Sequence, residues 1–94
     1  MLALSATSIA TAQLAVLRRA NPGLFSVVAA RIQSIRDDPG GPDAGRVFVL
    51  DDATAARLAT FFDVVARRDL VLVWKIDVDD NIPMLRLIRA GHVE

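Results

Sequence analysis

Residues 70–76 read Leu-Val-Leu-Val-Trp-Lys-Ile, and this stretch decides the fold. It is almost entirely apolar and rich in β-branched residues, which is typical of a strand in the middle of a sheet. Residues 77–81, Asp-Val-Asp-Asp-Asn, favour a turn, and residues 83–89, Pro-Met-Leu-Arg-Leu-Ile-Arg, predict a strand that returns beside the first. The sequence therefore predicts a β-hairpin in the last third of the chain.

Two segments precede this hairpin, and only one of them has a single interpretation. Residues 46–50, Arg-Val-Phe-Val-Leu, predict a strand. Residues 52–65 fit a strand followed by a hairpin turn at 66–69, and they also fit a helix, which local propensity slightly favours. The helix would have an apolar face made of Leu58, Phe61, Phe62 and Val65.

The first half of the chain predicts a helical hairpin. Residues 2–4 are a short apolar segment suited to an edge strand, and the hydroxyl residues that follow at positions 5, 7 and 8 are candidate N-caps. Ala10, Leu14 and Leu17 then recur at helical spacing. Asn21-Pro22-Gly23 is a strong stop signal, and a second helical pattern begins directly after it.

The second helix is predicted from apolar residues that repeat at helical spacing, followed by a loop at residues 37–43. That loop reads Asp-Asp-Pro-Gly-Gly-Pro-Asp, and its prolines and glycines cannot continue a helix. Helices joined by so short a turn should lie antiparallel. The helical pattern consists of Leu24, Val27, Val28, Arg31, Ile32 and Ile35.

Length, charge and composition limit the functions that the chain can have. Its 94 residues make one domain, residues 1–94, and its net charge of zero argues against wholesale phosphate binding. The lack of cysteine excludes disulfides and thiolate metal sites, and a single histidine excludes a site built on several imidazoles. We expect no cofactor and no metal, because no nucleotide-binding, serine-hydrolase or zinc-protease motif is present.

The apolar start of the chain lacks a positively charged segment, and no apolar run approaches the length of a membrane span. We therefore expect a cytoplasmic protein without a membrane association. Asp77, Asp79 and Asp80 resemble a cation-binding loop, but the glycine and the distal glutamate of the EF-hand pattern are missing.

The predicted order is a short strand, two helices, an Asp-Pro loop and an antiparallel meander that ends in Gly-His, and it resembles the RelE/ParE toxin superfamily. Residues 69–76, Asp-Leu-Val-Leu-Val-Trp-Lys-Ile, are similar to a strand of its YafQ-like branch, and residues 87–92, Leu-Ile-Arg-Ala-Gly-His, are similar to that branch's last strand. Leu4-Ser5, Asp38-Pro39 and Arg57-Leu58 add weaker similarities. The resemblance implies an α+β fold of the RelE kind, with residues 56–64 as a strand.

The resemblance also implies a chemistry. Cleavage of RNA at a 2′-hydroxyl needs a base, an acid and a cation that stabilises the phosphoryl charge. His92 is the candidate acid or base, and Arg89 and Arg57 are the candidate catalytic cations, expected on a shared surface of the sheet. Arg86 and Arg89 are three residues apart, so they face opposite sides of a strand unless a bulge intervenes. The candidate nucleic-acid-binding residues are Arg67, Arg68, Lys75 and Arg86.

The leading hypothesis is the toxin of a bacterial toxin–antitoxin pair, an endoribonuclease that cleaves mRNA, either free or on the ribosome, and is neutralised by an antitoxin. A toxin directed at gyrase, as in the ParE branch, is an alternative. A second is a non-catalytic interaction module of the same fold, either an inactive relative or a subunit that forms a homodimer, whereas a toxin would form a hetero-oligomer with its antitoxin. The neutral charge, the lack of tyrosine and the single lysine, Lys75, favour this module, whereas the Arg89/His92 ending favours the toxin.

Overall fold

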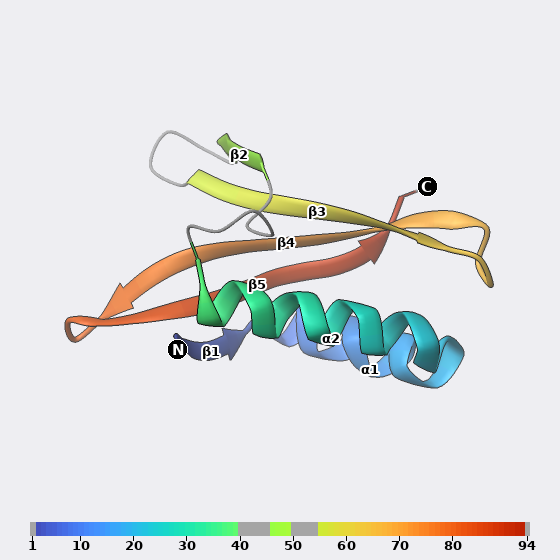
Figure 1. Cartoon of the computed structure of the whole chain (residues 1–94), viewed down its shortest axis with the longest axis horizontal. Helices are drawn as coiled ribbons and strands as arrows, with labels where there is room; N and C mark the ends of the chain where they lie inside the picture. The colour runs from blue at the N-terminus through green and yellow to red at the C-terminus, as the bar shows by residue number, and fades with distance from the viewer. Residues whose placement is uncertain (1, 40–45, 50–54, 94) are drawn as a thin grey trace.

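The computed structural model describes residues 2–39, 46–49 and 55–93, and it has two layers (Figure 1). Two helices cover one face of a five-stranded sheet with the strand order β1-β5-β4-β3-β2. β1 runs parallel to β5, and the other neighbouring strands are antiparallel. The α+β class predicted from the sequence is confirmed. The elements are β1 (Ala3–Ala6), α1 (Ser8–Ala20), α2 (Pro22–Asp37), β2 (Arg46–Val49), β3 (Ala55–Asp63), β4 (Arg68–Asp79) and β5 (Ile82–His92).

β4 and β5 form the predicted hairpin, with a shorter turn than expected. Their pairing extends to Asp79 and Ile82, so the connection is only Asp80 and Asn81. These two residues have φ values of 50° and 64°. Positive φ at both central residues matches the twist of a two-residue hairpin, and Asp and Asn tolerate it better than most residues. Residues 77–79, expected in the turn, therefore belong to the strand.

β3 settles the ambiguous segment in favour of a strand, so the helical interpretation is wrong for residues 55–63. Its partner is β4, in a register that runs from Arg57 opposite Trp74 to Asp63 opposite Arg68. The turn after β3 covers residues 64–67, two residues earlier than the predicted 66–69. The Asp63 carboxylate accepts hydrogen bonds from the backbone N–H groups of Val65 and Ala66, which starts the turn there. Residues 52–54 lie outside the described residues.

The two helices begin and end close to the predicted positions, but Pro22 and Gly23 of the expected turn and Asp37 of the expected loop belong to α2. Thr7 is the N-cap of α1, and its hydroxyl accepts a hydrogen bond from the backbone N–H of Ala10. Asn21 ends α1 and is the N-cap of α2, where its side chain accepts from the backbone N–H of Leu24. Pro22 occupies the first turn of α2, where a backbone nitrogen has no hydrogen-bond partner within the helix, so the missing N–H of proline costs nothing there. The one residue Asn21 thus joins the two helices.

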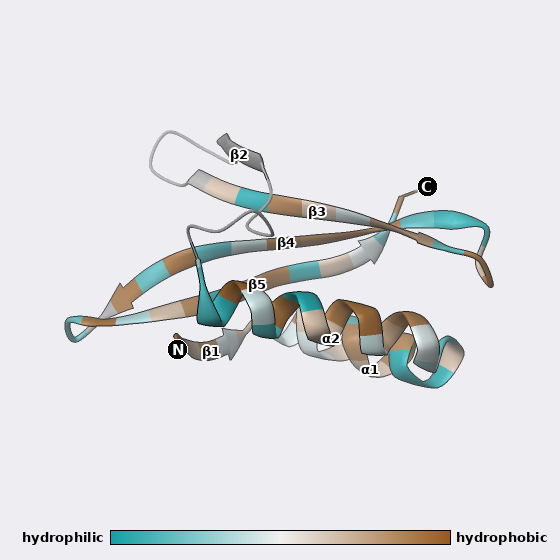
Figure 2. Cartoon of the chain, viewed as in Figure 1, coloured by the Kyte–Doolittle hydropathy of each residue, from teal (hydrophilic) through white to brown (hydrophobic). Residues whose placement is uncertain are grey.

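The core lies between the helices and one face of β3, β4 and β5. Hydrophobic residues, brown in Figure 2, run along both helices and along the strands that they cover. Trp74 is fully buried, as expected for a core residue. Among the described residues, no helix is long and apolar enough to cross a bilayer. The buried cluster contains Ala10, Leu17, Val28, Ile32, Ile35, Ala59, Phe61, Leu70, Leu72, Trp74, Leu85, Leu87 and Ala90.

The remaining predictions concern the ends of elements. The expected first strand is present as β1 at a sheet edge, two residues longer than the predicted 2–4 at its C-terminal end. β2 covers residues 46–49 of the predicted 46–50. Residues 40–43 of the predicted loop lie outside the described residues, as does residue 50. The helix before that loop ends at Asp37, with Asp38 as its C-cap.

Candidate functional site

His92 and Asp63 form a close polar pair at one end of the sheet. His92 is the last residue of β5, and Asp63 is the last residue of β3. Nε2 of the imidazole lies 2.7 Å from Oδ2 of the carboxylate. Both side chains point toward the helices, because Phe61 and His92 both register opposite Leu70 and Asp63 follows Phe61 by two positions.

Asp63 is buried and its carboxylate is satisfied by several partners. The residue is only 2% exposed. Oδ1 accepts from Nδ2 of Asn21 at 3.0 Å and from the backbone N–H groups of Val65 and Ala66 at 3.0 and 3.1 Å. The hydrogen bond to His92, followed by those to Ala66 and Asn21, lowers the pKa of Asp63 from 3.8 to about 2, against the opposing effect of burial. The carboxyl group is therefore ionised at neutral pH.

An ionised Asp63 determines how His92 can exchange protons. A carboxylate only accepts hydrogen bonds, so it requires that Nε2 of His92 carry a proton. In the neutral imidazole, Nδ1 then holds the free lone pair, and the side chain is 26% exposed. Such an arrangement suits a general base that takes a proton at Nδ1 and holds its orientation through Nε2.

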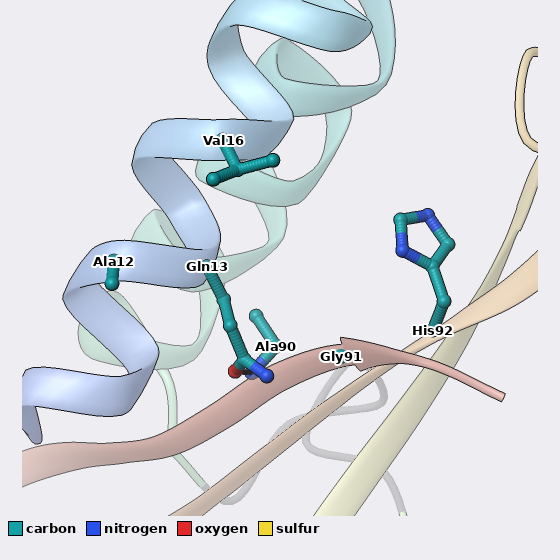
Figure 3. Close-up of a pocket in the computed structure, with 6 residues that line it drawn as sticks. All are labelled: Ala12, Gln13, Val16, Ala90, Gly91 and His92. Carbon is teal, nitrogen blue, oxygen red and sulfur yellow. Dashed lines mark hydrogen bonds between the residues drawn. The ribbon is translucent and has the colours of Figure 1, made fainter.

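A shallow pocket of about 240 Å³ lies beside His92, between α1 and the end of β5 (Figure 3). Ala12, Gln13 and Val16 of α1 form one wall, and Ala90, Gly91 and His92 form the other. The carboxamide of Gln13 reaches the strand beside Ala90, and the imidazole stands further along β5. Small apolar groups with two polar side chains make this pocket able to accept a small polar ligand group.

The strand β5 contains a bulge that changes which residues share a face. Arg89 pairs with Val73, whereas Leu87 pairs with Trp74, so Ile88 is an extra residue without a partner on β4. The bulge turns Arg86 and Arg89 to the same face, the one not covered by the helices. A regular strand would have separated these two arginines.

Arg57 does not share that face. It pairs with Trp74, whose side chain lies in the core under the helices, so Arg57 also points to the helix side. Arg89 pairs with Val73 and points to the opposite side. The expectation that Arg57 and Arg89 lie on a shared surface is therefore wrong, because their register positions on β4 are adjacent residues whose side chains point to opposite faces.

Arg89 and His92 line the same hollow, at the C-terminal end of β5. This second hollow, on the open face of the sheet, is lined by Val71, Val73, Arg89, Gly91, His92 and Val93. Gly91 and His92 also line the pocket beside α1, so the two hollows adjoin at these two residues. The structure thus brings together two of the three predicted catalytic residues and leaves Arg57 apart.

The four predicted nucleic-acid-binding residues fall into two groups. Lys75 and Arg86 lie on the open face, where Asp77 neutralises part of their charge at 3.6 and 3.2 Å. Lys75 and the backbone N–H of Val78 contribute to a lowered pKa of Asp77, the backbone N–H having the larger effect. Arg67 and Arg68 are exposed at the β3–β4 turn, at the same end of the sheet as His92.

Three polar residues of the site were not identified from the sequence. The sequence places Asp63 in an ambiguous segment, Asn21 in a stop signal and Gln13 within a predicted helix. The signal that could have found Asp63 is the single carboxylate in an otherwise uncharged stretch from Leu58 to Ala66. Within the part of the chain that the structure describes, no three His, Cys, Asp or Glu side chains gather as a metal site requires.

Comparisons of the chain with protein-family models, with curated proteins and with solved structures find no match.

Proposed function

We propose that the chain is a toxin of the RelE/ParE kind, an endoribonuclease that inhibits translation in the bacterial cytoplasm and is neutralised by an antitoxin. The observation that carries this proposal is the 2.7 Å contact between Nε2 of His92 and Oδ2 of Asp63. Ribonuclease chemistry at a 2′-hydroxyl needs an oriented base, and a histidine held by a buried carboxylate supplies one.

The proposed reaction assigns one role to each residue of the pair. Nδ1 of His92 takes the proton of the 2′-hydroxyl, and the resulting oxygen attacks the adjacent phosphorus. The bond from phosphorus to the 5′ oxygen breaks, and that oxygen takes a proton from solvent. The products are a 2′,3′-cyclic phosphate and a 5′-hydroxyl. Asp63 does not touch the substrate, and it acts as a positioning residue that holds the tautomer of His92.

Arg89 is the proposed cation for the phosphoryl charge that develops in this step. It lines the same hollow as His92, and none of the described acidic side chains forms an ion pair with it. Arginine presents donors that match two oxygens of a phosphate at once. Arg67 and Arg68, at the same end of the sheet, are proposed to hold the RNA backbone further from the reacting phosphate.

The alternative is a non-catalytic interaction module, and a specific observation favours it as well. Ile9 and Val16 of α1 and Val27 of α2 are 62%, 56% and 54% exposed. Exposed large apolar residues supply the contact area that a protein partner covers. Asp63 would then serve only to tie the ends of β3, β5 and α1 together.

The test is induced expression in a bacterium, with growth followed for the unmodified chain, His92→Ala and Arg89→Ala. The proposal expects growth arrest from the unmodified chain and relief by either substitution. A control is Val78→Ala, because Val78 is exposed on β4 and does not line the hollow that holds His92. No arrest from the unmodified chain contradicts the proposal and favours the interaction module.

A biochemical assay separates RNA cleavage from action on gyrase. The purified chain is incubated with an RNA and with the same sequence in which one nucleotide lacks its 2′-hydroxyl. Cleavage at that position only in the complete RNA, with a cyclic phosphate end, supports the proposed chemistry. Growth arrest that persists in His92→Ala, together with inhibition of DNA supercoiling, indicates gyrase instead.

A further inference from the structure

Gly91 is flanked by two hydrogen-bond donors that come from different elements. A side chain at this position would place its first carbon 3.0 Å from Nε2 of Gln13 and 3.3 Å from Nη2 of Arg89. Gln13 belongs to α1 and Arg89 to β5. The lack of a side chain on Gly91 therefore leaves the space into which both donors reach.

The amide of Gln13 has a defined orientation. Its Oε1 accepts a hydrogen bond of 2.7 Å from the backbone N–H of Ala90. Because that N–H can only donate, the oxygen must face Ala90 and the NH2 group must face away from it, toward Gly91. No acceptor for this NH2 group is present among the described residues. The backbone donor of Ala90 therefore decides which side-chain atom of Gln13 is the oxygen and which is the nitrogen.

The guanidinium of Arg89 is also available. Lys75 and Arg86, the other cations on the open face of β4 and β5, both lie near Asp77, whereas Arg89 has no such partner among the described side chains. Asp69 is the acidic residue of β4 nearest to this end of the open face, and its register position lies beyond Gly91, near Val93. Two donors therefore converge on Gly91 without a carboxylate between them.

We propose that Gln13 and Arg89, across Gly91, form a binding site for one phosphoryl group. Arginine and a neutral amide give donors of two kinds, which suit the several oxygens of a phosphate better than the two oxygens of a carboxylate. The source is the phosphodiester of RNA, and in this respect the inference rests on the proposed function. Gln13 is a substrate-binding residue that no motif of the sequence indicates, and α1 becomes part of the site.

Binding is measured by NMR on the purified full-length chain, with inorganic phosphate, acetate and a 2′-deoxy dinucleotide as separate probes. The side-chain NH2 signals of Gln13 and the Nε–H signal of Arg89 should shift together with phosphate and with the dinucleotide, and not with acetate. The dinucleotide cannot react, so this readout does not depend on catalysis. Saturation at lower concentration with the dinucleotide than with phosphate assigns the site to a phosphodiester, and the reverse order overturns that source.

The decisive variant is Gln13→Glu. Glutamate has the same length and can still accept from Ala90, but it replaces the free donor with a negatively charged acceptor. We expect the dissociation constant for the dinucleotide to rise by about tenfold or more, the size expected for loss of one charge-assisted contact. Gln33→Glu on α2 is the matched control, because it makes the same change in net charge on the other helix.

A second variant keeps the inference testable if Gln13→Glu does not fold. Gly91→Ala leaves every charge in place and puts a methyl group 3.0 Å from Nε2 of Gln13, so it should also weaken binding. Unchanged affinity in a folded Gln13→Glu or Gly91→Ala chain overturns the inference. Phosphate binding without RNA cleavage overturns the proposed function alone, and RNA cleavage that is insensitive to Gln13→Glu overturns this inference alone.

Discussion

His92 and Asp63 are 29 residues apart in the sequence, yet Nε2 of one lies 2.7 Å from Oδ2 of the other. Each residue ends a strand, and these strands do not neighbour each other in the sheet, because β4 lies between them. Asn21, the residue between the two helices, also donates a hydrogen bond to the Asp63 carboxylate. One buried acidic group therefore joins both layers of the fold at the end where the candidate site lies.

This pair makes the stability of the chain depend on pH in a defined direction. The pKa of Asp63 is about 2 in the folded chain and near its ordinary 3.8 when unfolded, so its ionised form stabilises the fold fully above pH 3.8. That stabilisation is lost as the pH falls through about 2. Asp63→Asn should therefore be less stable than the unmodified chain at neutral pH, with the difference shrinking as the pH is lowered through this range. Urea unfolding at a series of pH values measures it, and a difference that stays constant with pH contradicts the prediction.

Substitution of the pair should also reduce RNA cleavage. His92→Gln removes the proposed base, and we expect the rate constant to fall by roughly 10²- to 10⁴-fold. Asp63→Asn should lower the rate and change its pH dependence, because an amide that donates to Nε2 favours the other tautomer of His92. Val78→Ala is a suitable control, since Val78 is 64% exposed and does not line the hollow that holds His92. A pH profile that is identical in Asp63→Asn and the unmodified chain argues for a purely structural Asp63.

Thr7 joins the start of α1 to the edge of β5, so its hydroxyl should contribute to stability. It donates to the backbone carbonyl of Ile88 at 2.6 Å and accepts from the backbone N–H of Ala10 at 3.1 Å. Thr7→Val removes both bonds at nearly constant volume, and we expect a loss of about 1–2 kcal/mol in the free energy of unfolding. Thr7→Ser keeps the hydroxyl and should lose much less. Equal losses in the two variants, measured by urea unfolding, would show that the hydroxyl contributes no more than the methyl group and would contradict the prediction.

Ile88 is an extra residue in β5, so its removal should leave the faces of Arg89 and His92 unchanged. Deletion of Ile88 makes β5 regular and keeps Leu87 opposite Trp74 and Arg89 opposite Val73. We expect the hydrogen-bonded Nε2 proton signal of His92 to remain in the NMR spectrum of the deletion variant, with some loss of stability because the Ile88 carbonyl accepts from Thr7. Ile88→Ala keeps the number of residues and should also retain that signal. Loss of the signal in the deletion variant alone contradicts this register.

The core should respond to truncation far more than the hairpin tip. Leu72 is fully buried at the centre of β4, so Leu72→Ala should cost about 2–5 kcal/mol in the free energy of unfolding. Val78 lies on the same strand and is 64% exposed, and Val78→Ala should change stability by only about 0.5 kcal/mol. Thermal or urea unfolding of both variants provides the comparison. Similar losses at the two positions would mean that β4 does not hold the core as described.

Local pattern was enough to predict much of the fold. The strand from Leu70 to Ile76 and the end of the first helix at Asn21 both depend on residues close together in the sequence, and the structure confirms both of them. Residues 55–63 were different, because their helical and strand propensities are nearly balanced. Pairing with β4 decides that segment, and pairing is an interaction with residues far along the chain.

The sequence by itself determined the kinds of elements, their order and the supply of chemical groups, including a single histidine and ten arginines among eleven cations. Only the tertiary structure decided which of those groups meet. A bulge of one residue places Arg89 on the same face as Arg86, and strand register places Arg57 on the other face. The buried carboxylate of Asp63 contacts His92 although β4 lies between their strands. The physical reason is that side-chain direction in a sheet reverses with every residue, so one insertion or shift in register changes every neighbour.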